Sequence, residues 1–282
     1  MKTHSSTHQT VAACTWLFGH LNHRQIAERV ARLGLDGVEL LADIDRESPT
    51  ELRELYAQAG LAIVSLTPDN VNIAHVDAAE RDRAVSYYER LIAFASAVGS
   101  PRVTCHEQVG PAYMSDSLDT PEAEWPRLVE SCRHLAEVAA AQDISLVFEP
   151  LHSGLVNQVN RASQLCRLVD AIAHPALSAV LDTYHLHVAE ADPAAAIQHC
   201  GNRVSAVQLA AAHRRPPGDR PSPWLSRCLT TLEQIGFDGP WILECSTQLP
   251  GPSLVSRAID AERVDRELAT SLRWLRSQWA SG

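Results

Sequence analysis

The feature that most constrains the fold is an alternation of short apolar runs with longer amphipathic stretches along the whole chain. The short runs are apolar on both faces and β-branched in places, as strands buried in a parallel sheet are. Helical patterns lie between them, for example at 79–98, 121–142 and 160–172. Eight candidate strands can be assigned, at 10–18, 37–41, 61–66, 102–105, 144–149, 177–182, 204–209 and 241–245.

Eight strands that are each followed by a helix predict a closed (β/α)8 TIM barrel. Such a barrel typically takes about 250 residues as one unit, so we expect a single domain over residues 1–282. An open, doubly wound sheet is the alternative, but no Gly-x-Gly-x-x-Gly follows the first strand candidate. Helix starts are marked by a short polar residue before proline, at Ser48-Pro49, Thr120-Pro121, Asp192-Pro193 and Ser222-Pro223.

The charge and the cysteines narrow the classes of partner and compartment. A formal net charge of -10 counts against a nucleic acid or an anionic membrane as partner. No run approaches roughly 18 apolar residues, the length that a membrane span needs, and the first ten residues lack the apolar region of a signal peptide. Seven scattered cysteines without a Cys-x-x-Cys motif indicate reduced, buried thiols in a cytoplasmic protein.

Four oxygen-bearing side chains stand where otherwise apolar strand candidates end. They are Glu149, Asp182, Gln208 and Glu244, and they belong to the fifth to eighth candidate strands in order. In a parallel barrel the C-terminal strand ends converge on one rim, where active sites lie. One such residue alone is more often structural, whereas four in consecutive units indicate a shared site.

Three carboxylates at one rim repel one another unless a cation or protons neutralise them. A divalent metal removes that conflict, and three carboxylates with an amide oxygen form a hard, oxygen-rich ligand shell. We therefore expect one divalent metal, manganese or magnesium, with cobalt or zinc as candidates if His185 contributes. Unrelated helix caps and salt-bridge acids are the alternative interpretation of the four residues.

The sequence resembles the xylose isomerase-like TIM-barrel proteins, a superfamily of sugar isomerases, sugar 3-epimerases, hydroxypyruvate isomerase and inosose dehydratase. The resemblance runs from residue 33 to residue 244. It implies that Glu149, Asp182, Gln208 and Glu244 are the metal ligands. Glutamine in the third place is similar to hydroxypyruvate isomerase, whereas the sugar 3-epimerases generally use histidine. The motifs that carry the resemblance are VFEP (147–150), LDTYH (181–185), VQLAAAHRRPPG (207–218) and GFDGPWILE (236–244).

The same resemblance implies substrate contacts. His185, three residues after Asp182, would hydrogen-bond a substrate oxygen, and Arg214 would bind the substrate from the loop after the seventh strand. The segment EPLHSGL (149–155) departs from the 3-epimerases, which have Leu-Asn-Arg and a further glutamate there. His152 would line the pocket in place of those groups, so the resemblance by itself does not imply a ketohexose 3-epimerase specificity.

Strand ends in the first half of the chain supply further candidates. Glu39 ends the second candidate strand and His106 follows the fourth, so both are predicted to face the pocket, with Glu39 anchoring other rim groups. His20, together with Trp16 and Phe18, is predicted to form a wall for the substrate at the end of the first strand. Simple packing is the alternative for each.

The leading hypothesis for function is an isomerase or epimerase of a sugar or keto-polyol. The metal would bind two vicinal oxygens of the substrate, and Glu149 and Glu244 would remove and return a proton through an enediolate. The substrate itself is not defined, because the loops after the first four strands match the family least. Barrels of this kind often pair through helices or long loops, so a homo-oligomer is also expected.

Three alternatives remain at this point. A dehydratase of the inosose or dehydroshikimate type would use the same metal site and expel a hydroxyl group, with His185 as the acid. An apurinic endonuclease would need extra histidines that this chain lacks, since the third strand ends in SLTPDN. A barrel that binds a ligand without catalysis is the third, and the complete set of acids argues against it.

Overall fold

The strands form a closed barrel in the computed structural model, which describes residues 9–110, 121–249, 251 and 257–280. Each strand runs parallel to its neighbours in sequence order, and β1 pairs with both β2 and β8. The predicted (β/α)8 barrel is confirmed and the open sheet is excluded. The strands are β1 (Val11–Cys14), β2 (Gly37–Leu40), β3 (Ala62–Leu66), β4 (Arg102–Cys105), β5 (Ser145–Phe148), β6 (Leu177–Asp182), β7 (Val204–Leu209) and β8 (Trp241–Leu243).

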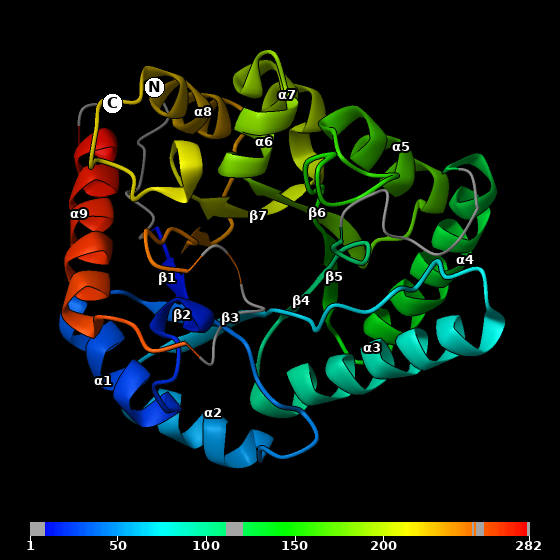
Figure 1. The fold of residues 1–282 in the computed structure, drawn as a ribbon, viewed down its shortest axis with the longest axis horizontal. Helices are drawn as coiled ribbons and strands as arrows, with labels where there is room; N and C mark the ends of the chain where they lie inside the picture. The colour runs from blue at the N-terminus through cyan, green and yellow to red at the C-terminus, as the bar shows by residue number, and fades with distance from the viewer. Residues whose placement is uncertain (1–8, 111–120, 250, 252–256, 281–282) are drawn as a thin grey trace, which may run out of the picture.

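The helices surround the barrel (Figure 1). They are α1 (His23–Leu33), α2 (Pro49–Gln58), α3 (Ala78–Val98), α4 (Pro121–Ala140), α5 (Ala162–Ile172), α6 (Thr183–Ala189), α7 (Pro193–Cys200), α8 (Pro223–Gln234) and α9 (Ala261–Trp279). Short 3-10 turns are η1 (Thr15–Phe18), η2 (Gly201–Arg203) and η3 (Ala212–Arg214). The ring closes where α9 packs beside α1, with Asp265 bridging Arg29 and Arg32 at 2.6 Å each (Figure 1).

Proline marks four of the helix starts as predicted, because α2, α4, α7 and α8 begin at Pro49, Pro121, Pro193 and Pro223. Thr120, the predicted cap of α4, lies outside the described residues. Strand boundaries agree with the predicted ones within two residues, except for the first. There, only Val11–Cys14 is a strand, and the rest of the predicted 10–18 segment is the buried turn η1.

The interior of the barrel and the layer between strands and helices form one continuous apolar core, in which Trp16, Trp241 and Phe148 are among the largest fully buried side chains. All seven cysteines are buried thiols without a disulfide. The polar side chains of the strands gather where the strands end, so the C-terminal rim is the place to look for chemistry.

None of the helices in the described part of the chain combines the length and the hydropathy that crossing a bilayer requires.

Candidate metal centre and active site

The four predicted donors meet at the C-terminal rim of the barrel. Asp182 is the last residue of β6, and its register partner on β7 is Gln208. Glu149 and Glu244 directly follow the last residues of β5 and β8. All four side chains are buried. The shared parallel register therefore brings together residues that the sequence spreads over almost a hundred positions.

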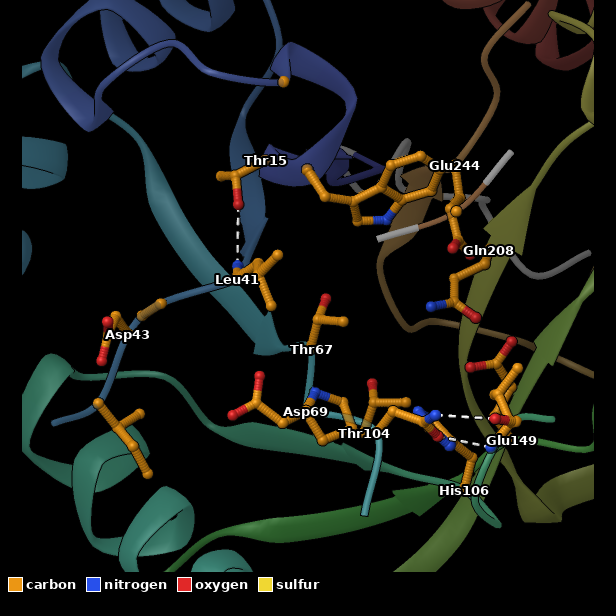
Figure 2. A pocket seen from close by; sticks show the side chains of 18 of the residues that line it. Thr15, Leu41, Asp43, Thr67, Asp69, Thr104, His106, Glu149, Gln208 and Glu244 are labelled. Carbon is orange, nitrogen blue, oxygen red and sulfur yellow. Dashed lines mark hydrogen bonds between the residues drawn. The ribbon is translucent and has the colours of Figure 1, made fainter. Parts of the chain in front are cut away.

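A cavity of about 770 Å³ opens above these residues. Glu149, Gln208 and Glu244 line one side of it, and Asp43 and Asp69 lie across from them (Figure 2). The loops after the strands form its walls, as in other barrels of this type. Other lining residues are Thr15, Trp16, Leu41, Thr67, Thr104, His106, His185 and Arg214.

The donor set fits a divalent metal on two observations. One ligand atom each from Glu149, Asp182 and His185 lies within 4.8 Å of the others. In addition, Asp182 Oδ2, Gln208 Oε1 and Glu244 Oε2 are buried and have no hydrogen-bond partner. Buried polar atoms are normally satisfied, so three such oxygens at one rim indicate that a cation belongs among them.

Arg214 approaches the acids from the loop after β7. Its Nη1 lies 3.0 Å from Glu244 Oε1, and its Nη2 makes an ion pair with Asp182 Oδ2 at 3.2 Å. His213 and Arg214 have φ angles of 58° and 52°, a left-handed conformation that is strained for residues with a Cβ. The sequence predicted Arg214 at the substrate, and the structure places its guanidinium against two of the predicted metal ligands, Asp182 and Glu244.

Burial dominates the electrostatics of the acids. It raises the pKa of Glu149 well above its ordinary value, and the negative charges of Glu244 and Asp182 raise it further. Burial also raises the pKa of Asp182, and it raises that of Glu244 to about 8 against the opposing effect of Arg214. Although burial alone would lower the pKa of Arg214, these three carboxylates raise it. At neutral pH Glu244 therefore holds a proton that a cation would displace.

His185 lies in α6, between the acids and the arginine. Its Nε2 is 3.4 Å from Asp182 Oδ2 and 2.9 Å from Arg214 Nη2. Its Nδ1 is 3.3 Å from the backbone nitrogen of His152. Burial and the charge of Arg214 lower the pKa of His185 well below its ordinary value, so the ring is neutral. A neutral imidazole accepts a hydrogen bond at one nitrogen only. The tautomer therefore decides whether the ring accepts from Arg214 at Nε2 or from the backbone nitrogen of His152 at Nδ1.

Three other predicted substrate contacts are not where the sequence suggested. His20 is exposed, contacts the carbonyl of Arg257, and is absent from the described cavity lining, although the residues on either side of it line the cavity. Glu39 is fully buried and is likewise absent from that lining, but its hydrogen bond from Gln208 agrees with the predicted anchoring of another rim group. The ring of His152 packs against Tyr184, outside the lining.

His106 and Trp16 do line the cavity, whereas Phe18 is buried in the core. Burial lowers the pKa of His106, so its ring is neutral.

Sequence reasoning missed four polar residues of the first half of the barrel. Thr104 lies near the end of β4, and Asp43, Thr67 and Asp69 follow β2 and β3. The rule that identified the acids, a polar residue at a strand end, would have found Thr67 and Thr104. No pattern marked Asp43 and Asp69, because their loops have no regular geometry.

A further missed residue, Glu107, organises the loop after β5. Its carboxylate accepts the backbone N–H groups of Gln158 at 2.9 Å and Val159 at 2.5 Å. Burial raises the pKa of Glu107 to about 7. Glu107 thereby ties the loop after β4 to the loop after β5, just beyond the segment 149–155 that departs from the 3-epimerases, and Leu155 of that segment lines the cavity.

Comparisons with known proteins agree with this geometry. The chain is 24% identical over 274 residues to the D-psicose 3-epimerase of Ruminiclostridium cellulolyticum, covering 90% of this chain and 92% of that protein. It is 28% identical over 191 residues to the 3-dehydroshikimate dehydratase of Pseudomonas putida, covering 66% of this chain and 28% of that protein.

Among solved structures, D-psicose 3-epimerase with D-tagatose from Clostridium cellulolyticum H10 superposes with a TM-score of 0.85 at 22% identity, over 95% of this chain and 99% of that one. This likeness shows a common fold. The model of the xylose isomerase-like TIM-barrel family matches residues 27–278, almost the whole described barrel. The chain belongs to the xylose isomerase-like TIM-barrel family.

Proposed function

We propose that the protein is a divalent-metal-dependent epimerase or isomerase of a sugar or keto-polyol. The observation that carries this proposal is the cluster of Glu149, Asp182, Gln208 and Glu244, in which three buried oxygens have no hydrogen-bond partner at the floor of a large cavity. The similarity to ketose 3-epimerases supports the same class of reaction.

The four rim residues would hold the metal, manganese or magnesium by the hardness of their oxygens. Such an ion supplies electrophilic stabilisation of the oxygens next to the reacting carbon, which acidifies its C–H bond. The chain's own residues then have to move a proton and to orient the substrate.

Glu149 and Glu244 suit the two ends of a proton transfer. Burial raises the pKa of both carboxyl groups, that of Glu244 to about 8, and a raised pKa suits groups that work in turn as an acid and a base. One removes the proton on the carbon next to the carbonyl, which leaves an enediolate, and the other returns it. Return on the opposite face gives an epimer, and return on the neighbouring carbon gives an isomer.

Arg214 and two neutral histidines complete the site. Arg214 balances the acids and presents a planar fork that suits a hydroxyl–carbonyl pair. His185 and His106 are buried and neutral, so each can donate or accept a hydrogen bond at a substrate oxygen without adding charge.

The experiment that tests the proposal follows solvent deuterium into the sugar. The protein, loaded with Mn²⁺, is incubated in deuterium oxide with a panel of unphosphorylated and phosphorylated ketoses. We expect an epimer or isomer of unchanged composition, in which deuterium replaces the hydrogen on the carbon next to the carbonyl. A folded protein that binds no Mn²⁺ and turns over no sugar of the panel would instead favour a ligand-binding barrel.

A dehydratase is the second candidate, favoured by the similarity to the 3-dehydroshikimate dehydratase and by His185, which lies close to both Glu149 and Asp182. In that reaction the same proton is removed, and a β-hydroxyl group leaves as water after protonation. Mass spectrometry of the product separates the candidates, because dehydration removes one water from the mass and epimerisation leaves the mass unchanged.

A further inference from the structure

Glu39 is a buried carboxylate whose partners are all neutral. It lies on β2 with its side chain fully buried. In the ranges that the structure describes, no arginine, lysine or histidine forms an ion pair with it. Three hydrogen bonds satisfy it instead: Thr104 Oγ1 donates to Oε1 at 2.9 Å, and Cys14 Sγ and Gln208 Nε2 each donate to Oε2 at 3.0 Å. Such a group is retained inside a protein only when hydrogen bonds replace its hydration.

The bond to Gln208 determines which end of that amide faces the acids. A carboxylate oxygen accepts hydrogen bonds, so it draws the amide nitrogen of Gln208 toward β2. The carbonyl oxygen Oε1 is left on the other side, buried and without a hydrogen-bond partner. That oxygen belongs to the same rim as Asp182, which is the register partner of Gln208. The Oδ2 atom of Asp182 is also buried without a hydrogen-bond partner.

We propose that Glu39 is a positioning residue that selects the metal-binding end of Gln208, an inference that rests on the proposed metal site. The two ends of a glutamine amide are almost identical in shape and opposite in polarity. A site that uses glutamine as a ligand therefore needs a second group to present the oxygen rather than the nitrogen. Glu39 supplies this choice from 169 residues away in sequence, across the barrel.

The first test replaces the carboxylate by an amide of the same size, Glu39→Gln. The new side chain can donate as well as accept, so it no longer selects the orientation of Gln208. We expect Mn²⁺ to bind the chelator-treated variant about 10–100-fold more weakly than the wild type, as is typical when such an outer partner is lost. Isothermal titration calorimetry with Mn²⁺ alone measures the affinity without reference to turnover. Cys14→Ala is the matched control, since it removes another donor to Glu39 and leaves the bond to Gln208 in place.

The second test reverses the direction of the hydrogen bond. Gln208→Glu alone brings two carboxylates together at the present 3.0 Å contact, which we expect to weaken folding and to perturb the site. The double variant E39Q/Q208E again has one donor and one acceptor, and it keeps the net charge. We expect it to recover most of the Mn²⁺ affinity that E39Q loses. A purely structural role of Glu39 predicts no recovery.

A crystal structure of the wild-type protein grown with Mn²⁺ provides a measurement that needs no variant. We expect Gln208 Oε1 on the ion and Nε2 on Glu39. Gln208 turned away from the ion, or E39Q binding Mn²⁺ as tightly as the wild type, would overturn the role of Glu39 alone. A wild-type protein that binds no divalent metal would overturn the proposed function and this inference together.

Discussion

The two halves of the barrel end their strands with different chemistry. In the first half, β1–β4, the rim positions that face the cavity carry hydroxyl groups, from Thr15, Thr67 and Thr104. In the second half, β5–β8, the corresponding positions carry Glu149, Asp182, Gln208 and Glu244. Figure 2 shows the three threonines on one side of the cavity and Glu149, Gln208 and Glu244 on the other.

The acids of the two halves are also compensated differently. In the first half, Asp45 and Glu47 on the loops pair with Arg90 and His23, and the buried Glu39 is satisfied by neutral hydrogen-bond donors. In the second half, Asp182 and Glu244 share the guanidinium of Arg214. Repulsion between buried acids is therefore stored in the second half. Under the proposed function, metal binding and proton transfer belong to the second half, together with the substrate contacts of Arg214 and His185, and the first half adds further substrate contacts.

The largest expected effect tests this division directly. Glu149→Gln and Glu244→Gln each remove a proposed proton carrier and a metal ligand, so we expect kcat to fall by at least about 10²–10⁴-fold. Glu47→Gln, the same change in the first half of the same cavity, is the control and should cost little. Steady-state kinetics with the substrate found in the panel measures all three. Near-normal turnover of either variant in the second half would break the comparison.

Removing Arg214 tests whether repulsion is stored in the second half. Arg214→Met leaves buried carboxylates without their cation, and losing one partner of such a pair costs about 3–5 kcal/mol of unfolding free energy. Added Mn²⁺ should restore part of that loss. The adjacent, partly exposed Arg215 pairs with Asp219 at the surface, so Arg215→Met should cost about 0–1 kcal/mol. Urea unfolding at pH 8 compares them, and equal losses would contradict the assignment.

The pH dependence of metal binding gives a third test. Burial raises the pKa values of Glu149 and Asp182, and it raises that of Glu244 to about 8. A metal must displace the proton that Glu244 holds below that pH, and Mn²⁺ affinity should therefore increase as the pH rises toward about 8. Calorimetry in buffers of different ionisation enthalpy counts the released protons. An affinity that stays constant between pH 6 and pH 8 would mean that the cluster is already ionised.

A substitution in the first half of the barrel is expected to have a smaller effect on the kinetics. Asp69 faces the cavity across from the metal site, and its pKa is raised by burial and by Asp43. If it accepts a hydrogen bond from a substrate hydroxyl, Asp69→Asn should raise KM by about 2–10-fold, the equivalent of one hydrogen bond, with kcat nearly unchanged. A fall in kcat with KM preserved would instead place Asp69 in the chemistry.

The smallest effect concerns backbone strain. The left-handed residues other than glycine in the described chain are Asp143, Ala173, His213 and Arg214, all in the second half. His213→Gly relieves steric strain and adds entropy to the unfolded chain, so we expect the unfolding free energy to change by no more than about 1 kcal/mol, with activity retained. Thermal unfolding measures it. A large loss would show that the His213 side chain itself supports the loop.

Much of the fold was predictable from local pattern. The strand candidates were located because buried parallel strands are apolar on both faces, and proline marked the starts of four helices. The first strand was predicted too long, since η1 is as apolar and as buried as a strand. Periodicity cannot separate a short buried turn from a buried strand.

Part of the candidate site was also predictable, because strand ends of a parallel barrel share one rim. That rule located Glu149, Asp182, Gln208 and Glu244, and strand order alone placed them in adjacent units. It failed for His20, whose side chain is exposed, and for the loop residues Asp43 and Asp69, since loop paths depend on contacts with other loops.

The sequence by itself determined the elements and the residues at their ends, because periodicity and strand-end position are local properties. Only the tertiary structure decided how those residues face one another. The guanidinium of Arg214 among the acids and the bond from Gln208 to Glu39 join groups far apart in the chain. The polarity and direction of these contacts depend on closure of the barrel, because closure brings β2 and β7 to face the same interior. No local sequence pattern encodes this closure.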